Sequence, residues 1–75
     1  MEMIESSASP ITLLNGAPHP LTAAVSIDRF LGSLGLEGKP VVVELNEEAI
    51  FPRDYTATLV HPGARIEIVT LAAGG

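Results

Sequence analysis

The sequence predicts an α+β domain in which one helix lies across one face of a mixed β-sheet of four to five strands. The chain has 75 residues, which leaves room for a single hydrophobic core. Hydrophobic residues make up 47% and charged residues 17%, so the chain is too apolar and too weakly charged for intrinsic disorder. One stretch with helical periodicity lies between several strand-like stretches, and this order is typical of the α+β class.

We expect residues 1–10 to form a flexible leader, because they contain three serines and a proline and show no periodicity. Their only charged side chains are Glu2 and Glu5, so the leader has neither the positive charge nor the apolar run of a signal peptide. No apolar run in the chain approaches the roughly 18 residues of a membrane span. The chain has no cysteine, which fits a reducing compartment, and we expect a cytoplasmic protein.

A first hairpin is predicted over residues 11–25. Residues 11–14 are a strand candidate, and Asn15-Gly16 is a strong turn signal because both residues tolerate positive φ angles. The segment Pro18-His19-Pro20 should lengthen the turn, since proline is excluded from central strands. The return strand is therefore expected at residues 21–24.

A single amphipathic helix is predicted over residues 26–34. Ser26 is a suitable N-cap, and Asp28 lies in the first turn, where a negative charge interacts favourably with the helix dipole. Gly35 can adopt the left-handed conformation that ends a helix, and Leu36 can supply the apolar contact that accompanies it. The apolar face has helical spacing and consists of Ile27, Phe30, Leu31 and Leu34.

The second half of the chain is expected to contain strands and tight turns. The expected order is a strand at residues 41–45, a turn at 46–48, a strand at 49–51 that stops at Pro52, a helical turn at 53–55, a short strand at 58–60, a type II turn at 61–64 and a last strand at 65–71.

The first and last strands are expected to pair in parallel at the centre of the sheet. The helix and the later turns form a crossover that is long enough to connect parallel neighbours. A sheet of this order with one helix across it has the β-grasp layout. The predicted domain covers residues 11–71, and residues 72–75 are expected to form a flexible tail.

The most informative feature of the sequence is its C-terminus, where Gly74-Gly75 follow the small residues Ala72 and Ala73. Glycines are entropically costly to order and contribute no packing, so this pair favours a backbone that enters a narrow channel of another protein. The Gly75 α-carboxylate, with a reference pKa of about 3.3–3.7, is ionised at neutral pH and can attack the α-phosphorus of ATP. The resulting acyl-adenylate would accept a later nucleophile. The alternative is that the two glycines are a frayed end.

A docking surface is expected beside the tail. If Ile66 and Ile68 point into the core, the strand period places the alternate residues of the last strand on the opposite face. Exposed apolar side chains next to a terminus favour a partner-binding role, although isolated ones are common on protein surfaces. The predicted docking residues are Leu14, Val42, Glu67, Val69, Leu71, Ala72 and Ala73.

Charge and side-chain chemistry argue against several other functions. A net charge of −5 repels nucleic acid and anionic membranes and favours a basic protein groove as the partner. His19 and His61 each precede a proline in a turn, and two histidines without further ligands make a poor metal site. The adjacent carboxylates of Glu47 and Glu48 are expected to face water rather than a substrate. We expect the small core to leave no room for a ligand pocket of about 300 Å³ or more.

Several stretches together match one known pattern. They are Leu14-Asn15-Gly16, Val25-Ser26-Ile27, Val42-Val43-Glu44-Leu45-Asn46, Phe51-Pro52-Arg53-Asp54, Gly63-Ala64-Arg65-Ile66-Glu67-Ile68-Val69 and Gly74-Gly75. In this combination, residues 11–75 resemble the ThiS family, the ubiquitin-like β-grasp sulfur carriers of thiamine biosynthesis. The departures from the family pattern are the leader and the Ala72-Ala73 pair before the glycines.

This resemblance implies that an E1-like adenylating enzyme of the ThiF type, using ATP and magnesium, activates the Gly75 carboxylate. A persulfide donor then supplies sulfur that replaces the adenylate, which leaves a C-terminal thiocarboxylate. A thiazole synthase of the ThiG type takes up that sulfur. The chain itself would be the carrier and the substrate, not an enzyme, and would bind no cofactor or metal.

Three other functions stay open from the sequence. One is a sulfur carrier for molybdopterin or another metabolite, with the same terminus and a different acceptor. A second is a ubiquitin-like modifier that is conjugated to target proteins through Gly75, for which Lys39 is the only lysine at which chains of the modifier itself would form. A third is an interaction module whose tail is inert.

Overall fold

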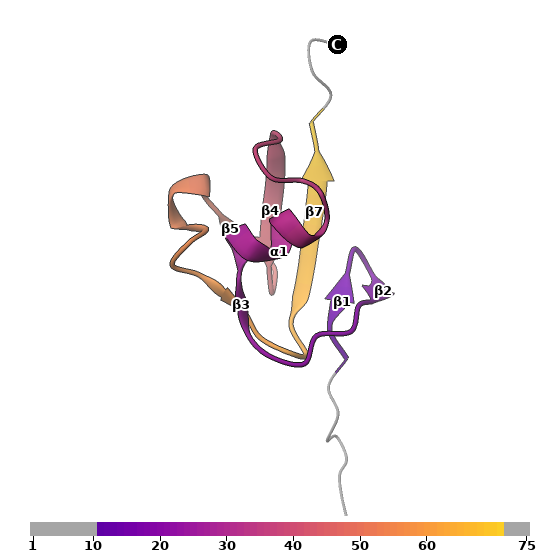
Figure 1. Cartoon of the computed structure of the whole chain (residues 1–75). Coiled ribbons are helices and arrows are strands. Elements are labelled where there is room, and N and C mark those ends of the chain that lie inside the picture. Colours follow the sequence, from indigo (N-terminus) through magenta and orange to yellow (C-terminus); the bar gives the residue numbers. More distant parts are fainter. Residues whose placement is uncertain (1–10, 72–75) are drawn as a thin grey trace, which may run out of the picture.

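The computed structural model describes residues 11–71, so the predicted leader at 1–10 and the predicted tail at 72–75 lie outside the described residues. Within them, one α-helix lies against a mixed sheet (Figure 1), as the sequence predicts. The elements are β1 (Leu13–Leu14), β2 (Ala17–Pro18), β3 (Val25–Ser26), α1 (Ile27–Ser33), β4 (Val41–Leu45), β5 (Glu48–Ile50), the 3-10 helix η1 (Pro52–Asp54), β6 (Leu59–Val60) and β7 (Arg65–Thr70).

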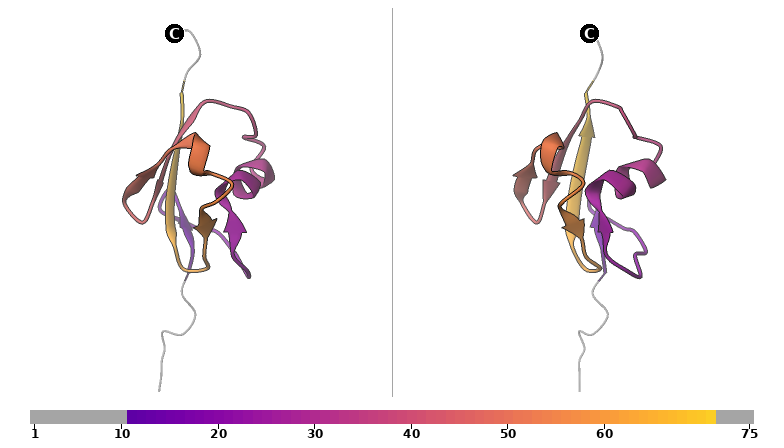
Figure 2. Two further views of the ribbon diagram at one scale, coloured as in Figure 1. Left: turned by 90° about the vertical axis from the view of Figure 1, so that its left-hand side faces the viewer. Right: turned by 60° about the vertical axis from the view of Figure 1, so that its left-hand side comes forward.

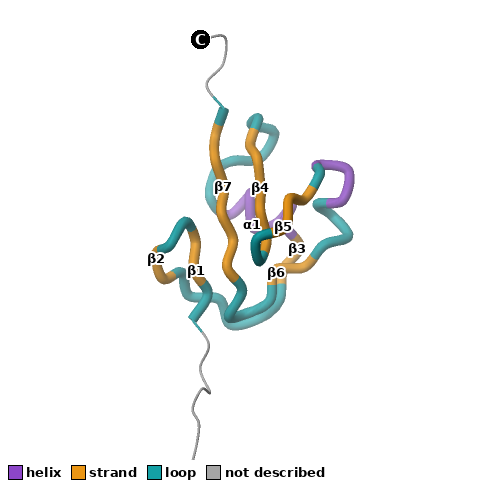
Figure 3. Tube along the Cα trace, turned by 180° about the vertical axis from the view of Figure 1, so that it is seen from behind, coloured by secondary structure: helices purple, strands orange, loops and turns teal. Residues whose placement is uncertain are grey.

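The main sheet has five strands in the order β2-β1-β7-β4-β5, with β7 in the middle. β1 pairs with β7 in parallel, and the other neighbours pair antiparallel. The predicted central parallel pair is therefore confirmed. Helix α1 covers one face of this sheet, as the side views in Figure 2 show, and the opposite face, seen in Figure 3, is free of helices in the described chain. We call this second face the outer face.

The first hairpin is tighter than the sequence prediction. Asn15 and Gly16 form the predicted turn, with φ angles of 52° and 83°, but the return strand β2 follows them at once and pairs Leu14 with Ala17. The predicted return strand at residues 21–24 is therefore wrong. Pro18 is tolerated in β2 because β2 is the edge of the sheet, where a strand needs hydrogen bonds on one side only.

A second, two-stranded sheet was not expected from the sequence. β3 and β6 pair antiparallel, with Val25 opposite Val60 and Ser26 opposite Leu59. This pairing ties the start of the helix to the segment before β7, because Ser26 is both the end of β3 and the N-cap of α1.

Helix α1 begins and ends as its sequence signals predict, one residue inside the expected bounds. The Ser26 hydroxyl oxygen accepts a hydrogen bond of 3.1 Å from the Arg29 amide. At the other end Gly35 has a φ angle of 75°, and its amide donates to the Gly32 carbonyl at 3.0 Å. The Leu36 amide donates to the Leu31 carbonyl at 2.9 Å, which completes a Schellman motif.

The two later turns also form largely as expected. Asn46 and Glu47, with φ angles of 52° and 70°, make a two-residue turn between β4 and β5, so Glu48 belongs to the strand and not to the turn. The predicted turn at residues 61–64 is closed by a 3.0 Å hydrogen bond from the Ala64 amide to the His61 carbonyl, and Gly63 has a φ angle of 92°.

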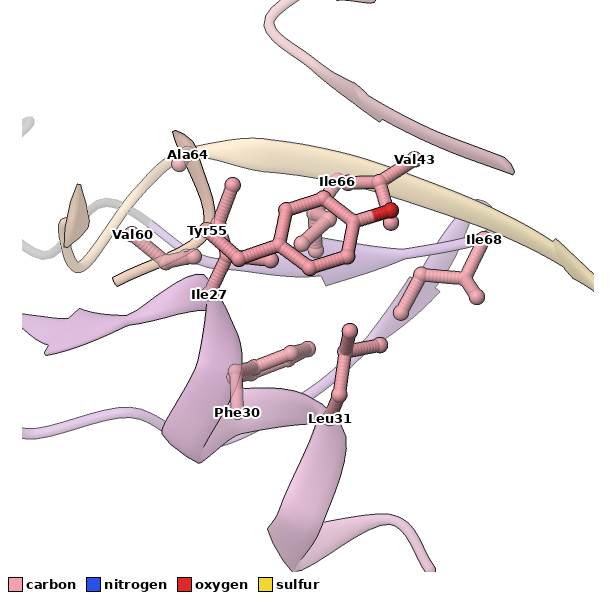
Figure 4. Close-up of a cluster of buried hydrophobic side chains, with 9 residues drawn as sticks. All are labelled: Ile27, Phe30, Leu31, Val43, Tyr55, Val60, Ala64, Ile66 and Ile68. Atoms are coloured by element: carbon pink, nitrogen blue, oxygen red, sulfur yellow. The ribbon is translucent and has the colours of Figure 1, made fainter. Parts of the chain in front are cut away.

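The core lies between helix α1 and the sheet (Figure 4). As predicted, Ile66 and Ile68 of β7 point into it, with exposed fractions of 0% and 6%. None of the helices in residues 11–71 is long and apolar enough to cross a membrane. The buried apolar cluster is Ile27, Phe30, Leu31, Val43, Tyr55, Val60, Ala64, Ile66 and Ile68.

Candidate functional site

The predicted reactive end, Gly74-Gly75, and its neighbours Ala72 and Ala73 lie outside the described residues, but the structure fixes where this segment begins. Leu71 follows directly after β7, and its amide donates a 3.0 Å hydrogen bond to the Pro40 carbonyl. Four residues follow Leu71, and four residues span at most roughly 13–14 Å when extended. Gly75 therefore cannot lie farther than that distance from Leu71.

The strand that leads to the terminus is held on both sides by asparagine side chains. The Asn15 side chain extends the short strand β1 along β7, because its Nδ2 donates to the Ile68 carbonyl at 3.1 Å and its Oδ1 accepts from the Ile68 amide at 2.7 Å. At the start of β7, the Oδ1 of Asn46 accepts from the Arg65 amide at 2.9 Å. Both asparagines occupy positive-φ turn positions, where asparagine is one of the favoured residues.

The outer face carries an apolar row next to the end of β7. Val69 is paired with Val42 of the neighbouring strand, and their exposed fractions are 58% and 45%. Phe51 follows β5 in an extended conformation and alternates with the partly buried Ile50, which places Phe51 on the outer face with an exposed fraction of 57%. We call Val42, Phe51 and Val69 the outer row.

Two carboxylates lie beside the outer row. Glu44 of β4 is paired with Glu67 of β7, and both residues are exposed on the outer face. Like charges directly opposite each other destabilise an antiparallel pair. A cation of another molecule would relieve the repulsion between these two carboxylates. This face therefore suits a partner with an apolar centre and a basic group next to it.

The structure separates the predicted docking residues. Val42, Val69 and Glu67 share the outer face, as predicted. Leu14 does not, because its parallel partner is Ile66 and its side chain packs against the core on the opposite face. The inclusion of Leu14 in the docking surface was therefore wrong, and the cause is a register that the sequence did not reveal. Leu71 is half exposed and lines a cavity together with residues of the helix side.

Sequence reasoning missed Phe51 and Glu44 as members of this face. The signal was available in both cases, since each residue alternates with an inward neighbour, Ile50 or Val43. The sequence predicts Phe51 only as the last residue of a strand that stops at Pro52. The guanidinium carbon of Arg53 lies 5.0 Å from the centre of the Phe51 ring, so this aromatic side chain also carries a cation.

A cavity of about 440 Å³ lies between the end of α1, the loop that follows it and the end of β7. The expectation that the small core would not be hollowed out into a ligand pocket is not contradicted by this cavity, which is open to the surface. It forms at the edge between helix and sheet, which no further element of residues 11–71 covers. Its wall contains Leu31, Leu36, Val41, Tyr55 and Leu71.

His19 is the second correction among the candidate groups. It was expected to be a solvated turn residue, but it is partly buried, and its ring meets the Phe30 ring edge-on with 5.1 Å between the ring centres. His61 is exposed, as expected. Glu47 pairs with Arg65 at 3.3 Å on the surface, a kind of contact that adds at most about 1 kcal/mol.

The sequence profile of the ThiS family matches residues 12–75, a range that contains all the strands and the helix described above. The chain belongs to the ThiS family. The match runs through Gly75, so it includes the terminal glycine pair on which the sequence prediction rested.

Individual relatives of this ThiS-family chain are of two kinds. The sulfur carrier protein ThiS of Thermus thermophilus is 37% identical over 62 residues, which cover 83% of this chain and 95% of that protein. Thiazole synthases of Paramagnetospirillum magneticum and Magnetococcus marinus are each 32% identical, over 63 and 62 residues. The chain spans 19% of the length of each of these two synthases.

Solved structures with the same fold include a thiamine biosynthesis protein (ThiS) from Geobacter metallireducens. Its crystal structure superposes with a TM-score of 0.74 at 26% sequence identity, over 87% of this chain and 99% of that chain. The solution structure of a thiamine biosynthesis protein from the same organism gives a TM-score of 0.72 at the same identity and covers 87% of each chain. The ThiS-family fold is thus supported by sequence and by structure.

Proposed function

We propose that this ThiS-family chain is a sulfur carrier of thiamine biosynthesis that holds sulfur as a thiocarboxylate at Gly75. The observation that carries the proposal is a family match that extends through the Gly74-Gly75 terminus on a β-grasp domain whose central strand leads directly to it. The 37% identity to the ThiS protein of Thermus thermophilus, over nearly the whole of that protein, supports the same function.

The chemistry needs a bare backbone terminus and a separate enzyme. A Gly75 carboxylate oxygen attacks the α-phosphorus of ATP, and pyrophosphate leaves. The terminal sulfur of a persulfide then attacks the carbonyl carbon of the acyl-adenylate, and AMP leaves. A thiol reduces the resulting acyl disulfide, which releases the thiocarboxylate and forms a new disulfide with the donor. ATP and magnesium belong to the adenylating enzyme, of the ThiF type, and the carrier supplies only its terminus.

The outer row and its two carboxylates are the surface that this enzyme would bind. Val42 and Val69 expose apolar area next to the end of β7, and desolvating such area on contact is favourable. Glu44 and Glu67 would each gain an opposite charge from a basic group of the enzyme. The net charge of −5 favours association with a positively charged enzyme groove.

A thiazole synthase of the ThiG type is the proposed sulfur acceptor. The support is that two proteins called thiazole synthase contain a stretch of about the length of this domain that is 32% identical to it. A domain of this type is therefore found in the same polypeptide as a thiazole synthase, which fits a functional link between the two. A carrier that delivers sulfur to another metabolite shares the same terminus and differs only in this acceptor.

Intact-mass analysis of the protein purified from its native host tests the proposal. We expect a fraction of the molecules to have one terminal oxygen replaced by sulfur, and we expect this species to be lost when Gly75 is deleted. Purified thiocarboxylate should then support thiazole formation by the synthase. Covalent adducts between Gly75 and lysines of other proteins, without a thiocarboxylate, would instead identify a protein modifier.

A further inference from the structure

The cavity beside Leu71 has the properties of a binding site. We propose that it receives an apolar side chain of the adenylating enzyme, and that the Tyr55 hydroxyl donates a hydrogen bond to an oxygen of that enzyme beside the inserted side chain. This assignment rests on the proposed function, because it takes the adenylating enzyme as the protein that acts on Gly75. It adds a second contact surface to the outer row, on the other side of β7.

The wall of the cavity suits an apolar group. Leu31 in the last turn of α1, Leu36 in the loop after it and Leu71 after β7 provide aliphatic surface in this wall. The volume of about 440 Å³ lies within the range of protein sites that hold small ligands and exceeds what one aliphatic side chain fills. Three charged residues also line the cavity, Asp28, Glu37 and Lys39, which leaves one net negative charge beside the aliphatic wall and disfavours an anionic occupant.

Tyr55 provides the second observation. Its side chain is 9% exposed and packs in the core, and its hydroxyl oxygen is buried without a hydrogen-bond partner in the described chain. Phenylalanine would fill the same space without an unsatisfied hydroxyl group, so the hydroxyl costs stability in the free domain. A phenol with the ordinary pKa of 10.0 is protonated and able to donate at neutral pH, and burial raises the pKa of Tyr55 further.

The hydroxyl is directed toward the end of the domain from which the terminus leaves. Figure 4 shows the Tyr55 ring between the helix and the sheet, with its oxygen on the side of Ile68 and Val43 and away from Val60. Ile68 lies in the part of β7 that leads to Leu71, and Leu71 and Tyr55 both line the cavity.

The occupant follows from the reach of the terminus. Only four residues separate Leu71 from the carboxylate, so an enzyme that acts on Gly75 has to approach Leu71 to within roughly 13–14 Å. Because Leu71 forms part of the cavity wall, such an enzyme comes close to the cavity opening. An apolar side chain of the enzyme would occupy part of this space, and an oxygen of the enzyme next to it would satisfy the Tyr55 hydroxyl.

Two variants and a matched control test the assignment in ATP–pyrophosphate exchange catalysed by the cognate adenylating enzyme. Leu71→Asn should raise the KM for the carrier about tenfold, the equivalent of losing roughly 1.4 kcal/mol of apolar contact. Leu59→Asn is the control, because Leu59 is similarly exposed, at 46% against 50% for Leu71, and lies on β6. This control should change the KM less than about twofold.

Tyr55→Phe separates binding from folding. It should raise the KM about threefold to tenfold without lowering the free energy of unfolding, because only the unpaired hydroxyl is removed. A structural role of the hydroxyl would instead lower the stability and leave the KM unchanged. Methyl NMR spectra, recorded with the enzyme and without ATP, should show shifts of Leu31, Leu36 and Val41.

The outcomes distinguish the two proposals. If the wild-type carrier gives no exchange at all, the proposed function is wrong and the cavity assignment falls with it. If the wild type reacts while both variants keep a wild-type KM and the methyl signals do not move, the function stands and the assignment is wrong. Shifts of the same methyl groups on deletion of residues 72–75, in the absence of enzyme, would show that the chain's own terminal segment fills the cavity, and would also overturn it.

Discussion

Asn15 shows how a single side chain can replace a stretch of strand. β1 has only two residues, and its hydrogen bonds to β7 would otherwise stop at Asn15, where the chain turns back into β2. The amide group of Asn15 binds both the carbonyl and the amide of Ile68 and so continues the pairing by one more residue. Asparagine meets two demands here, because it also tolerates the φ angle of 52°.

Asn15→Asp tests the contribution of these two hydrogen bonds between Asn15 and Ile68. Aspartate keeps an acceptor for the Ile68 amide but presents a charged oxygen to the Ile68 carbonyl, where Asn15 donates. We expect the free energy of unfolding in urea to fall by about 1–3 kcal/mol. Asn46→Asp is the matched control, since Asn46 accepts a bond from the Arg65 amide through Oδ1 and an aspartate oxygen can do the same. Equal losses of stability in the two variants would contradict this role for Asn15.

Tyr55 gives the domain a specific stability change at high pH. Burial raises the pKa of its phenol above the usual value of 10.0, so the folded state holds the proton more tightly than the unfolded state. The free energy of unfolding therefore does not depend on the ionisation of this phenol below pH 10, and it falls as the pH rises from there through the raised pKa. Urea unfolding between about pH 8 and 12 should show a steeper decline for the wild type than for Tyr55→Phe. Parallel declines would show that the phenol titrates alike in both states.

At the scale of the elements, the outer face combines two features that a free domain would avoid. The outer row exposes three large apolar side chains, and the neighbouring pair joins two carboxylates across β4 and β7. Both features lower the stability or solubility of the isolated domain, and both become favourable against an apolar and basic partner. The face is therefore better adapted to a complex than to the free protein.

Glu44→Gln should have opposite effects on stability and on binding. Removing one of the paired charges should raise the free energy of unfolding by about 0.2–1 kcal/mol, with a smaller gain at high salt. The same change should raise the KM in the adenylation assay, because one charge contact with the enzyme is lost. Glu48→Gln is the control, since Glu48 is paired with Leu45 and not with a second carboxylate. A stability gain as large in the control would sink the explanation.

At the scale of the whole molecule, the sequence predicted what strong local signals and chain order determine. Ser26 and Gly35 marked the ends of the helix, and the alternation in β7 put Ile66 and Ile68 into the core. The order of the elements, together with the resemblance to the ThiS family, indicated the parallel pairing of β1 with β7. Each of these features follows from a local sequence signal or from the order of the elements, which leaves few other arrangements of the chain.

The remaining features depend on contacts between segments far apart in sequence. Pro18 could be placed in a strand only once β2 was known to be an edge, and the face of Leu14 depended on its register with Ile66. The pairing of Val25 with Val60 joins two stretches too short to be identified by pattern. The orientation of the Tyr55 hydroxyl likewise follows from the packed core and not from its neighbours in sequence.

The position of β7 also constrains how the protein is made. β7 is the last strand along the chain but the middle strand of the sheet, between β1 and β4. A nascent polypeptide that has not yet brought Arg65 to Thr70 out of the ribosome cannot assemble the sheet, because β1 and β4 have no strand between them. A chain whose translation stops before this point cannot fold. We therefore expect such truncated chains to be degraded by proteases rather than to compete with intact chains for partner enzymes.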